Sequence, residues 1–91
     1  MHLRPGVPLQ VTLYGRPGCH LCDEAEATLR RIARDLPVLL TVVDIEGDEA
    51  LLRRYLFEIP VVTVDGSEVA RAPISPVRLQ AELAARANPD G

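Results

Sequence analysis

An α/β fold with the element order β-α-β-α-β-β-α is predicted by three observations on the sequence. An alternating apolar run at residues 9–14 is followed by a helical pattern and then by a nearly continuous apolar run at residues 38–44. Further along, Asp65-Gly66 separates two short segments, which is the strongest local signal for a β-hairpin. Ser75-Pro76 combines a helix cap with a proline at the first helical position, so a last helix is expected after the hairpin.

Length and composition fit one small domain. The chain has 91 residues, 47% of them hydrophobic, which is enough for a single core. We expect one domain over residues 1–91, with its core at about 9–86 between an N-terminal arm and a C-terminal tail. The net charge of −3 predicts no nucleic-acid partner, and no apolar run is long enough to span a membrane. The N-terminal residues lack the apolar core of a signal peptide, so a cytoplasmic location is expected. The protein is expected to be a monomer.

The first half of the chain predicts a parallel βαβ unit with a right-handed crossover. Residues 9–14 form its first strand, and its helix runs from about His20 to Leu36. The inner face of this helix consists of residues that recur at helical spacing: Cys22, Ala25, Leu29, Ile32 and Leu36. Pro37 ends the helix. The apolar run at 38–44 is typical of a strand that is covered on both faces.

The second half predicts a short helix, a hairpin and a last helix. Asp48 is the expected cap of the short helix, whose apolar stripe consists of Leu51, Leu52, Tyr55 and Leu56. The hairpin strands are expected at residues 61–64 and 67–72. Pro60 stands at the start of the first of them, where its missing N–H is tolerated. The last helix is expected at about residues 76–86.

The only two cysteines, Cys19 and Cys22, lie where the first strand gives way to the first helix. A C-x-x-C pair in this setting is the pattern of a redox dithiol. The free N–H groups at a helix start favour an anion, and the thiolate is the form of cysteine that attacks a disulfide. We therefore expect Cys19 to be the nucleophile. Cys22, one turn into the helix, is expected to resolve the mixed disulfide that forms.

Three residues around the cysteines are further candidates for the site. Arg16 is a permanent cation three residues before Cys19, and we expect it to stabilise the thiolate. Pro17 stiffens the loop before the pair, and both Pro17 and His20 are expected to contribute to substrate binding. Histidine changes its charge near neutral pH, so His20 is also a candidate proton shuttle. The simpler interpretation, which we favour, is that His20 is exposed and tunes the redox potential.

Metal binding is the alternative chemistry for two cysteines. A closed zinc site needs four ligands, often two C-x-x-C pairs, but this chain has no second pair and its only histidines are His2 and His20. No metal site within one chain is therefore expected. A metal or iron–sulfur module that dimerises through Cys19 and Cys22 is the second hypothesis. A non-catalytic interaction domain that uses the edge of the hairpin is the third.

The element order, the Cys19-His20-Leu21-Cys22 motif and Ile59-Pro60 before the third strand resemble the thioredoxin fold in its minimal glutaredoxin form. Within it, the stretch from Arg16 to Ala25 resembles the small bacterial glutaredoxin-like family. The resemblance covers roughly residues 9–86. It implies a mixed four-stranded sheet with helices on both faces, and a cis peptide bond before Pro60, which would lie beside the cysteines.

The resemblance also implies a function, that of a thiol–disulfide oxidoreductase. The backbone of Ile59 would pair with the backbone of a bound thiol substrate as an added strand. Arg16 stands at the position where glutaredoxins often carry a Lys that lies close to the thiolate. The implied partners are disulfide-bearing client proteins, with a reductase or a low-molecular-weight thiol as electron donor. No cofactor is expected besides the redox-active Cys19–Cys22 disulfide.

The sequence departs from the glutaredoxin pattern at several positions. The motif is Cys-His-Leu-Cys rather than the common Cys-Pro-Tyr-Cys, and Glu58 stands where glutaredoxins often have Thr. Residues 71–75 replace the glycine pair that helps to hold glutathione, and Leu13 stands where thioredoxins carry a buried acid. We therefore expect weak use of glutathione.

Overall fold

The computed structural model describes residues 7–88, so most of the expected N-terminal arm and C-terminal tail lies outside the described residues. The elements follow the predicted order: β1 (Leu9–Gly15), α1 (His20–Asp35), β2 (Val38–Asp44), the 3₁₀ turn η1 (Ile45–Gly47), α2 (Glu49–Tyr55), β3 (Val61–Val64), β4 (Ser67–Arg71) and α3 (Pro76–Ala87). Within residues 7–88, none of the helices is both long and apolar enough to cross a membrane.

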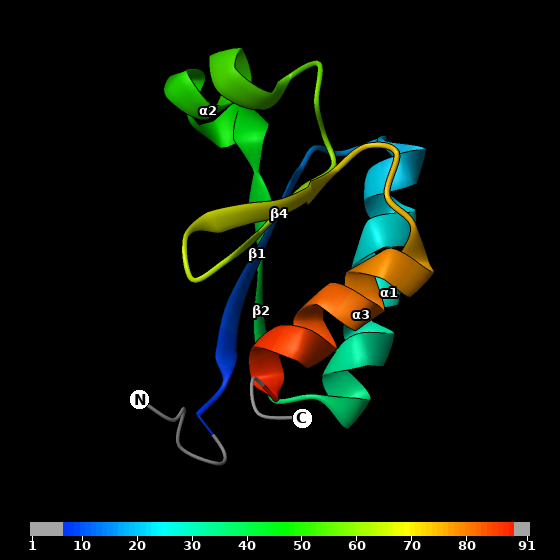
Figure 1. Cartoon of the computed structure of the whole chain (residues 1–91). Coiled ribbons are helices and arrows are strands. Elements are labelled where there is room, and N and C mark those ends of the chain that lie inside the picture. Colours follow the sequence, from blue (N-terminus) through cyan, green and yellow to red (C-terminus); the bar gives the residue numbers. More distant parts are fainter. Residues whose placement is uncertain (1–6, 89–91) are drawn as a thin grey trace.

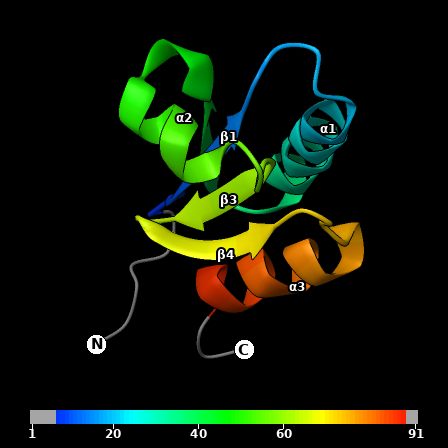
Figure 2. The ribbon, with the colours of Figure 1, turned by 90° about the horizontal axis from the view of Figure 1, so that it is seen from above.

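The strands form one mixed sheet in the order β2-β1-β3-β4 (Figure 1). β1 pairs with β2 in parallel, and the β1–β3 and β3–β4 pairs are antiparallel. Helices α1 and α3 lie on one face of this sheet and α2 lies on the other (Figure 2). The predicted mixed four-stranded sheet with helices on both faces is therefore confirmed.

The main core lies between the sheet and the helices α1 and α3. Alternate residues of β1 point into it, namely Leu9, Val11 and Leu13, and Leu29 of α1 and Leu83 of α3 are fully buried against them. A smaller cluster lies under α2 and consists of Ile45, Tyr55 and Val61. Helix α2 is only seven residues long, so it covers only the end of its sheet face that adjoins the start of α1.

Local signals for caps and turns are confirmed by the structure. The Asp48 carboxylate accepts hydrogen bonds from the N–H groups of Ala50 and Leu51, at 2.9 and 3.1 Å. Ser75 caps α3 in the same way through the N–H of Arg78, at 3.2 Å. Asp65 and Gly66 both have positive φ, 49° and 87°, as a tight hairpin turn requires.

The prediction that β2 is covered on both faces is wrong. β2 is an edge strand with one neighbour, and Leu39 and Val42 are 53% and 45% exposed. Leu39 lies on the face along which the short helix α2 does not reach, whereas Val42, level with Leu13, lies on the α1 face at the edge of the sheet. The apolar run therefore belongs to a strand that is only half-covered. The turn η1 was not predicted, and the other differences lie at element ends: β1 continues to Gly15, α1 ends at Asp35, β4 ends at Arg71 and α3 ends at Ala87.

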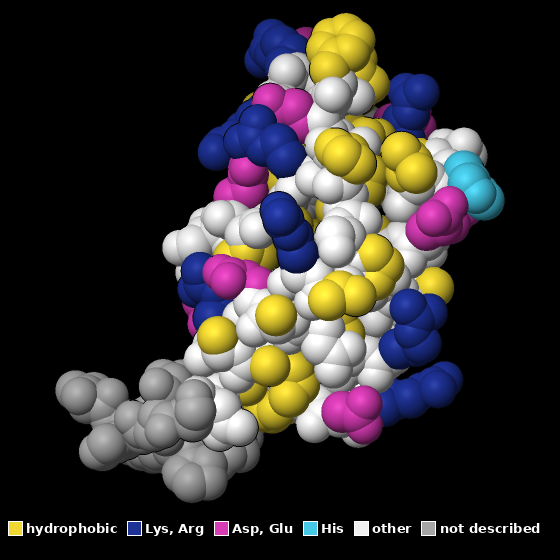
Figure 3. Space-filling view, turned by 45° about the vertical axis from the view of Figure 1, so that its right-hand side comes forward, with side chains coloured by type: hydrophobic (Ala, Val, Ile, Leu, Met, Phe, Trp, Pro, Cys, Tyr) yellow, Lys and Arg dark blue, Asp and Glu magenta, His cyan; other side chains and the backbone are white. Residues whose placement is uncertain are grey.

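Several large hydrophobic side chains remain on the surface. Those more than about two-fifths exposed among the described residues are Val7, Leu21, Leu39, Val42, Phe57 and Val77. In Figure 3 hydrophobic side chains lie at the upper end of the face, which holds α2 and the start of α1, and also in its middle and lower parts. Contiguous exposed apolar surface is typical of a site that binds another molecule.

Candidate functional site

A tight turn carries the chain from β1 into α1. The N–H of Cys19 donates to the carbonyl of Arg16 at 3.3 Å, and Pro17 and Gly18 are the two central residues. Gly18 has φ +78°, which together with the preceding proline is the signature of a type II turn. Only a residue that tolerates positive φ fits at this position. The turn therefore fixes where Cys19 meets the start of the helix.

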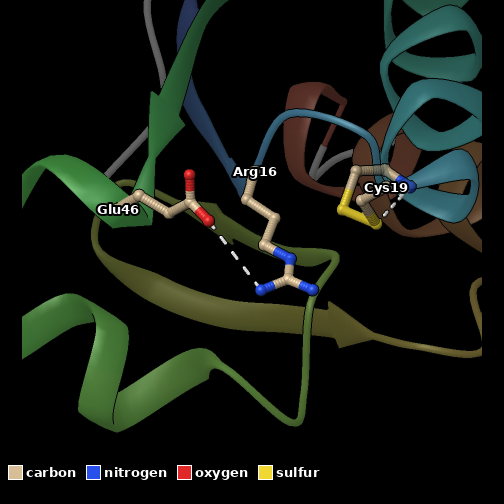
Figure 4. Close-up of a disulfide and its surroundings, with 4 residues drawn as sticks. Arg16, Cys19 and Glu46 are labelled. Carbon is tan, nitrogen blue, oxygen red and sulfur yellow. Dashed lines mark hydrogen bonds and ion pairs between the residues drawn. A yellow bond between two sulfur atoms is a disulfide. The ribbon is translucent and has the colours of Figure 1, made fainter.

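Cys19 is the N-cap residue of α1. Its Sγ accepts a hydrogen bond from the N–H of Cys22 at 3.1 Å, and its carbonyl accepts from the N–H of Asp23 at 3.1 Å. The two cysteines are joined by a disulfide, with their Cα atoms 5.2 Å apart (Figure 4). A thiolate at Cys19 would receive the same N–H and the positive end of the helix dipole.

The two sulfurs differ in accessibility. Cys19 is half-buried, whereas Cys22 is buried, with 5% of its surface exposed. Gly15, the last residue of β1, lies against Cys22 so closely that a Cβ at this position would be 3.0 Å from both Cβ and Sγ of Cys22. Gly15 was not among the predicted site residues, although a glycine at the end of a strand signals a close approach.

Arg16 projects toward η1 (Figure 4). Its Nη1 lies 3.8 Å from Oε2 of Glu46, and both side chains are about half exposed, so the attraction between them is screened by water. Glu46 was not among the predicted site residues. The stabilisation of the Cys19 thiolate by Arg16 stays a prediction, and Glu46 competes for the same cation.

His20 lies on the outer surface of the first turn of α1. Its side chain is 86% exposed, and Nε2 lies 2.8 Å from Oε2 of Glu24 one turn later. The exposed position agrees with the interpretation that we favoured from the sequence. The role of His20 as a proton shuttle stays a prediction.

The peptide bond between Ile59 and Pro60 is cis, as the resemblance implied. Pro60 is buried and forms the floor of a groove of about 140 Å³ beside the first turns of α1. The walls of this groove, which we call the Pro60 groove, include Leu21, Ala25, Pro73 and Ile74. A second cis bond, Ala72–Pro73, lies on its far wall and had no counterpart in the sequence analysis.

The backbone of Ile59 is partly engaged within the chain. Its N–H donates to the carbonyl of Tyr55 at 3.0 Å. The N–H of Ala72 donates to the carbonyl of Pro60 at 3.0 Å, so that carbonyl is also engaged. Within residues 7–88, no hydrogen bond uses the Ile59 carbonyl. The predicted pairing with a substrate backbone therefore has one acceptor available without rearrangement.

Arg71 stands where a glycine pair was expected by resemblance. Its guanidinium bonds Glu68 at 2.7 Å from Nε and Glu58 at 3.1 Å from Nη1. Glu68, and to a lesser extent Glu58, raise the pKa of Arg71 above its ordinary value. This cation is therefore already neutralised by two carboxylates next to the site.

No group of three or more His, Cys, Asp or Glu side chains within the described range 7–88 is arranged to hold a metal ion. A metal or iron–sulfur cluster shared between two chains needs cysteines that are accessible at the surface. Cys22, buried behind Gly15, is a poor ligand for such a shared site.

The sheet order, the cysteine pair at the start of α1 and the cis-proline beside it define a thioredoxin-fold protein of the minimal, glutaredoxin-like form. The sequence model of the family described as Glutaredoxin-like domain (DUF836) matches residues 10–84. The chain therefore belongs to this family. A search of curated proteins finds no match.

Solved structures agree with this assignment. Target protein XcR50 from X. campestris is 33% identical, with a TM-score of 0.70 over 82% of this chain and 96% of that chain. Protein Ne2328 from Nitrosomonas europaea is 32% identical, with a TM-score of 0.73 over 91% of this chain and 99% of that chain. A thioredoxin mutant from Halobacterium salinarum, 17% identical, shares the fold, with a TM-score of 0.67 over 87% of this chain and 74% of that chain.

The contact between Gly15 and Cys22 predicts the effect of adding one methyl group. Gly15→Ala places a Cβ 3.0 Å from the Cys22 side chain, so we expect the oxidised protein to lose about 1–3 kcal/mol of unfolding free energy. Gly47→Ala is the matched control, because nothing lies within 4 Å of its new Cβ, and its effect is expected within about 0.5 kcal/mol. Denaturant unfolding measures both. If the two variants have the same free energy of unfolding, the Cys22 side chain moves aside without loss of stability, which would contradict the prediction.

The Arg16–Glu46 pair predicts two opposite shifts in the reactivity of Cys19. Arg16→Ala should move the pH midpoint of Cys19 alkylation upward, because a cation that favours the thiolate is lost. Glu46→Gln should move it downward, because Arg16 is released from its carboxylate. Both shifts are expected to stay below about one pH unit, since the helix start remains.

The measurement is the rate of iodoacetamide alkylation against pH in the Cys22→Ser background. Arg53→Ala is the control, because Arg53 forms a 3.8 Å pair with Glu49 that matches the Arg16 pair in length but lies on α2. A midpoint that stays fixed in both Arg16→Ala and Glu46→Gln would show that Arg16 does not act on the sulfur.

Proposed function

We propose that the protein is a thiol–disulfide oxidoreductase that reduces disulfides with the Cys19–Cys22 pair. The observation that carries the proposal is the position of Cys19. Its sulfur is at the N-cap of α1 and accepts the Cys22 N–H at 3.1 Å, and Cys19 is the more exposed residue of the two. A thiolate there is stabilised and reachable, which are the two requirements for an attacking cysteine. We propose that it acts in the cytoplasm, where thiols are kept reduced.

The reaction would proceed in two exchanges. The Cys19 thiolate attacks one sulfur of the client disulfide, the client S–S bond breaks, and the other client sulfur leaves as a thiolate. Cys22 then loses its proton and attacks Sγ of Cys19, which releases the second client thiolate and forms the Cys19–Cys22 disulfide. The client gains two electrons and the protein loses two. A thiol donor restores the dithiol by the reverse exchange.

The Pro60 groove supports a protein client rather than a small charged one. Its walls are mostly apolar, and Leu21 on its rim is 54% exposed. Apolar surface beside the first turns of α1, which Cys19 caps, favours a client segment that presents hydrophobic side chains. The Ile59 carbonyl supplies one hydrogen-bond acceptor for the backbone of such a segment.

The charges around the site support weak use of glutathione. Glutathione carries two carboxylates, which need free donors to hold them. Arg71 is occupied by Glu58 and Glu68, and Asp23 and Glu24 add negative charge at the start of α1. Like charge disfavours an anionic ligand. A C-x-x-C pair can cycle without glutathione, so we propose a dithiol or a thioredoxin-reductase-type enzyme as the donor.

Two serine variants test the assignment of the cysteines. Cys19→Ser should abolish reduction of a protein disulfide, because the attacking sulfur is lost. Cys22→Ser should form mixed disulfides that persist, because nothing resolves them. Mass spectrometry of the trapped species gives the result directly. If Cys19→Ser traps the client while Cys22→Ser stays inert, the two roles are reversed; if neither variant traps one, the protein does not carry out this exchange.

A coupled assay tests the electron donor. We expect turnover with glutathione and its reductase to be at least roughly tenfold slower than with thioredoxin reductase, the effect of about 1.4 kcal/mol of lost binding. Glu58→Gln is the informative variant, since it removes one contact of Arg71 and should raise turnover with glutathione. Efficient turnover of the unmodified protein with glutathione alone would contradict the proposal.

A further inference from the structure

The two edges of the sheet are built differently. The β4 edge carries charged side chains, Glu68 and Arg71, and an irregularity in its register with β3 between Val62 and Thr63. Charges and bulges are devices that keep an edge strand from pairing with another chain. The β2 edge has no bulge, and its one charge is Asp44 at the end of the strand, where it caps η1. Residues 38–43 contain no charge and no proline, and within residues 7–88 no strand pairs with the outer side of β2.

The flank of α1 next to this open edge is charged in two halves. Asp23 and Glu26 line a cavity of about 240 Å³ together with residues 42–44 of β2, so this flank faces the β2 side. Glu26 accepts a hydrogen bond from Nε of Arg30 at 2.9 Å, and Arg34 follows one turn later. The flank is therefore acidic at the start of α1 and basic toward its end.

We propose that a second copy of this chain pairs with the β2 edge in antiparallel orientation, about a two-fold axis through Thr41. The start of α1 lies beside the carboxyl end of β2, so the axis brings the acidic half of one α1 next to the basic half of the other. Asp23 then faces Arg34 of the second copy. A surface that is complementary to itself is what a two-fold interface requires.

The register about Thr41 also matches the side chains of the two strands. Leu40 lies opposite Val42 of the second copy, Leu39 opposite Val43, and Thr41 opposite its own equivalent. Hydroxyl and apolar pairs of this kind stabilise neighbouring strands, and no like charges meet. The pairing joins two four-stranded sheets into one and covers the exposed Leu39 and Val42.

The dimensions of the edge fit such an interface. A strand of seven residues spans about 23 Å, and a helix of 16 residues spans about 24 Å, so strand and helix meet the second copy over the same length. The Pro60 groove lies on the other flank of α1, against Leu21 and Thr28, so this groove stays open in both copies. This inference replaces the sequence-based expectation of a monomer, and it does not depend on the proposed redox function.

Sedimentation analysis from about 1 µM to about 1 mM, the range in which complexes of moderate affinity dissociate, tests the proposal. We expect the unmodified protein to form a dimer within this range. Thr41→Lys, at an exposed position, places two ammonium groups at the axis and should raise the dissociation constant at least tenfold. Ser67→Lys, exposed on the β4 edge, is the matched control and should leave it unchanged.

Arg34→Glu tests the contribution of α1 and should weaken the dimer, and the double variant Asp23→Arg with Arg34→Glu should restore it. Thr41→Cys in a Cys19→Ser, Cys22→Ser background should form a symmetric disulfide dimer, because facing Cα atoms of antiparallel strands lie about 4.5–5.5 Å apart. Ser67→Cys in the same background should not. A monomer at every concentration, or a dimer that Thr41→Lys leaves intact, would overturn the proposal.

Discussion

The close approach of Gly15 to Cys22 is the contact on which the rest of the site depends. A hydrogen atom in place of a side chain lets the first turn of α1 lie against the end of a central strand. Cys22 is thereby held inside, and Cys19 is left partly exposed at the start of the helix. The same approach continues down the helix, where Ala25 and Leu29 are buried against the sheet. The close approach of Gly15 to Cys22 therefore accounts both for the packing of α1 on the sheet and for the difference in exposure between the two cysteines.

Features with local causes could be predicted from the sequence. A cap needs a short polar side chain a few residues from a free N–H, and Asp48 and Ser75 show this in the chain itself. The Asp65-Gly66 turn is local in the same sense. The cysteine pair was also predictable, because three residues of helix bring Cys19 and Cys22 together wherever the helix lies.

Features that depend on distant neighbours could not be predicted. The exposure of β2 follows from its place at the sheet edge and from the short reach of α2, and neither is visible in an apolar run. Glu46 meets Arg16 only because η1 folds beside the loop before α1. The engagement of the Ile59 N–H by Tyr55 depends on how α2 ends. Local propensity determines the secondary structure of each segment, whereas tertiary contacts determine which of its side chains and backbone groups remain accessible.

The hydrogen bond from the Cys22 N–H to Sγ of Cys19 affects the surface that the start of α1 offers to other molecules. Sγ of Cys19 accepts the Cys22 N–H while it is part of the disulfide, and a thiolate sulfur keeps lone pairs for the same donor. The hydrogen bond from the Asp23 N–H to the Cys19 carbonyl does not involve a sulfur atom, so oxidation of the cysteines does not act on it directly. Neither of these two hydrogen bonds requires the S–S bond between Cys19 and Cys22. The backbone at the start of α1 therefore has the same hydrogen-bond partners whether the two sulfurs are joined or separate.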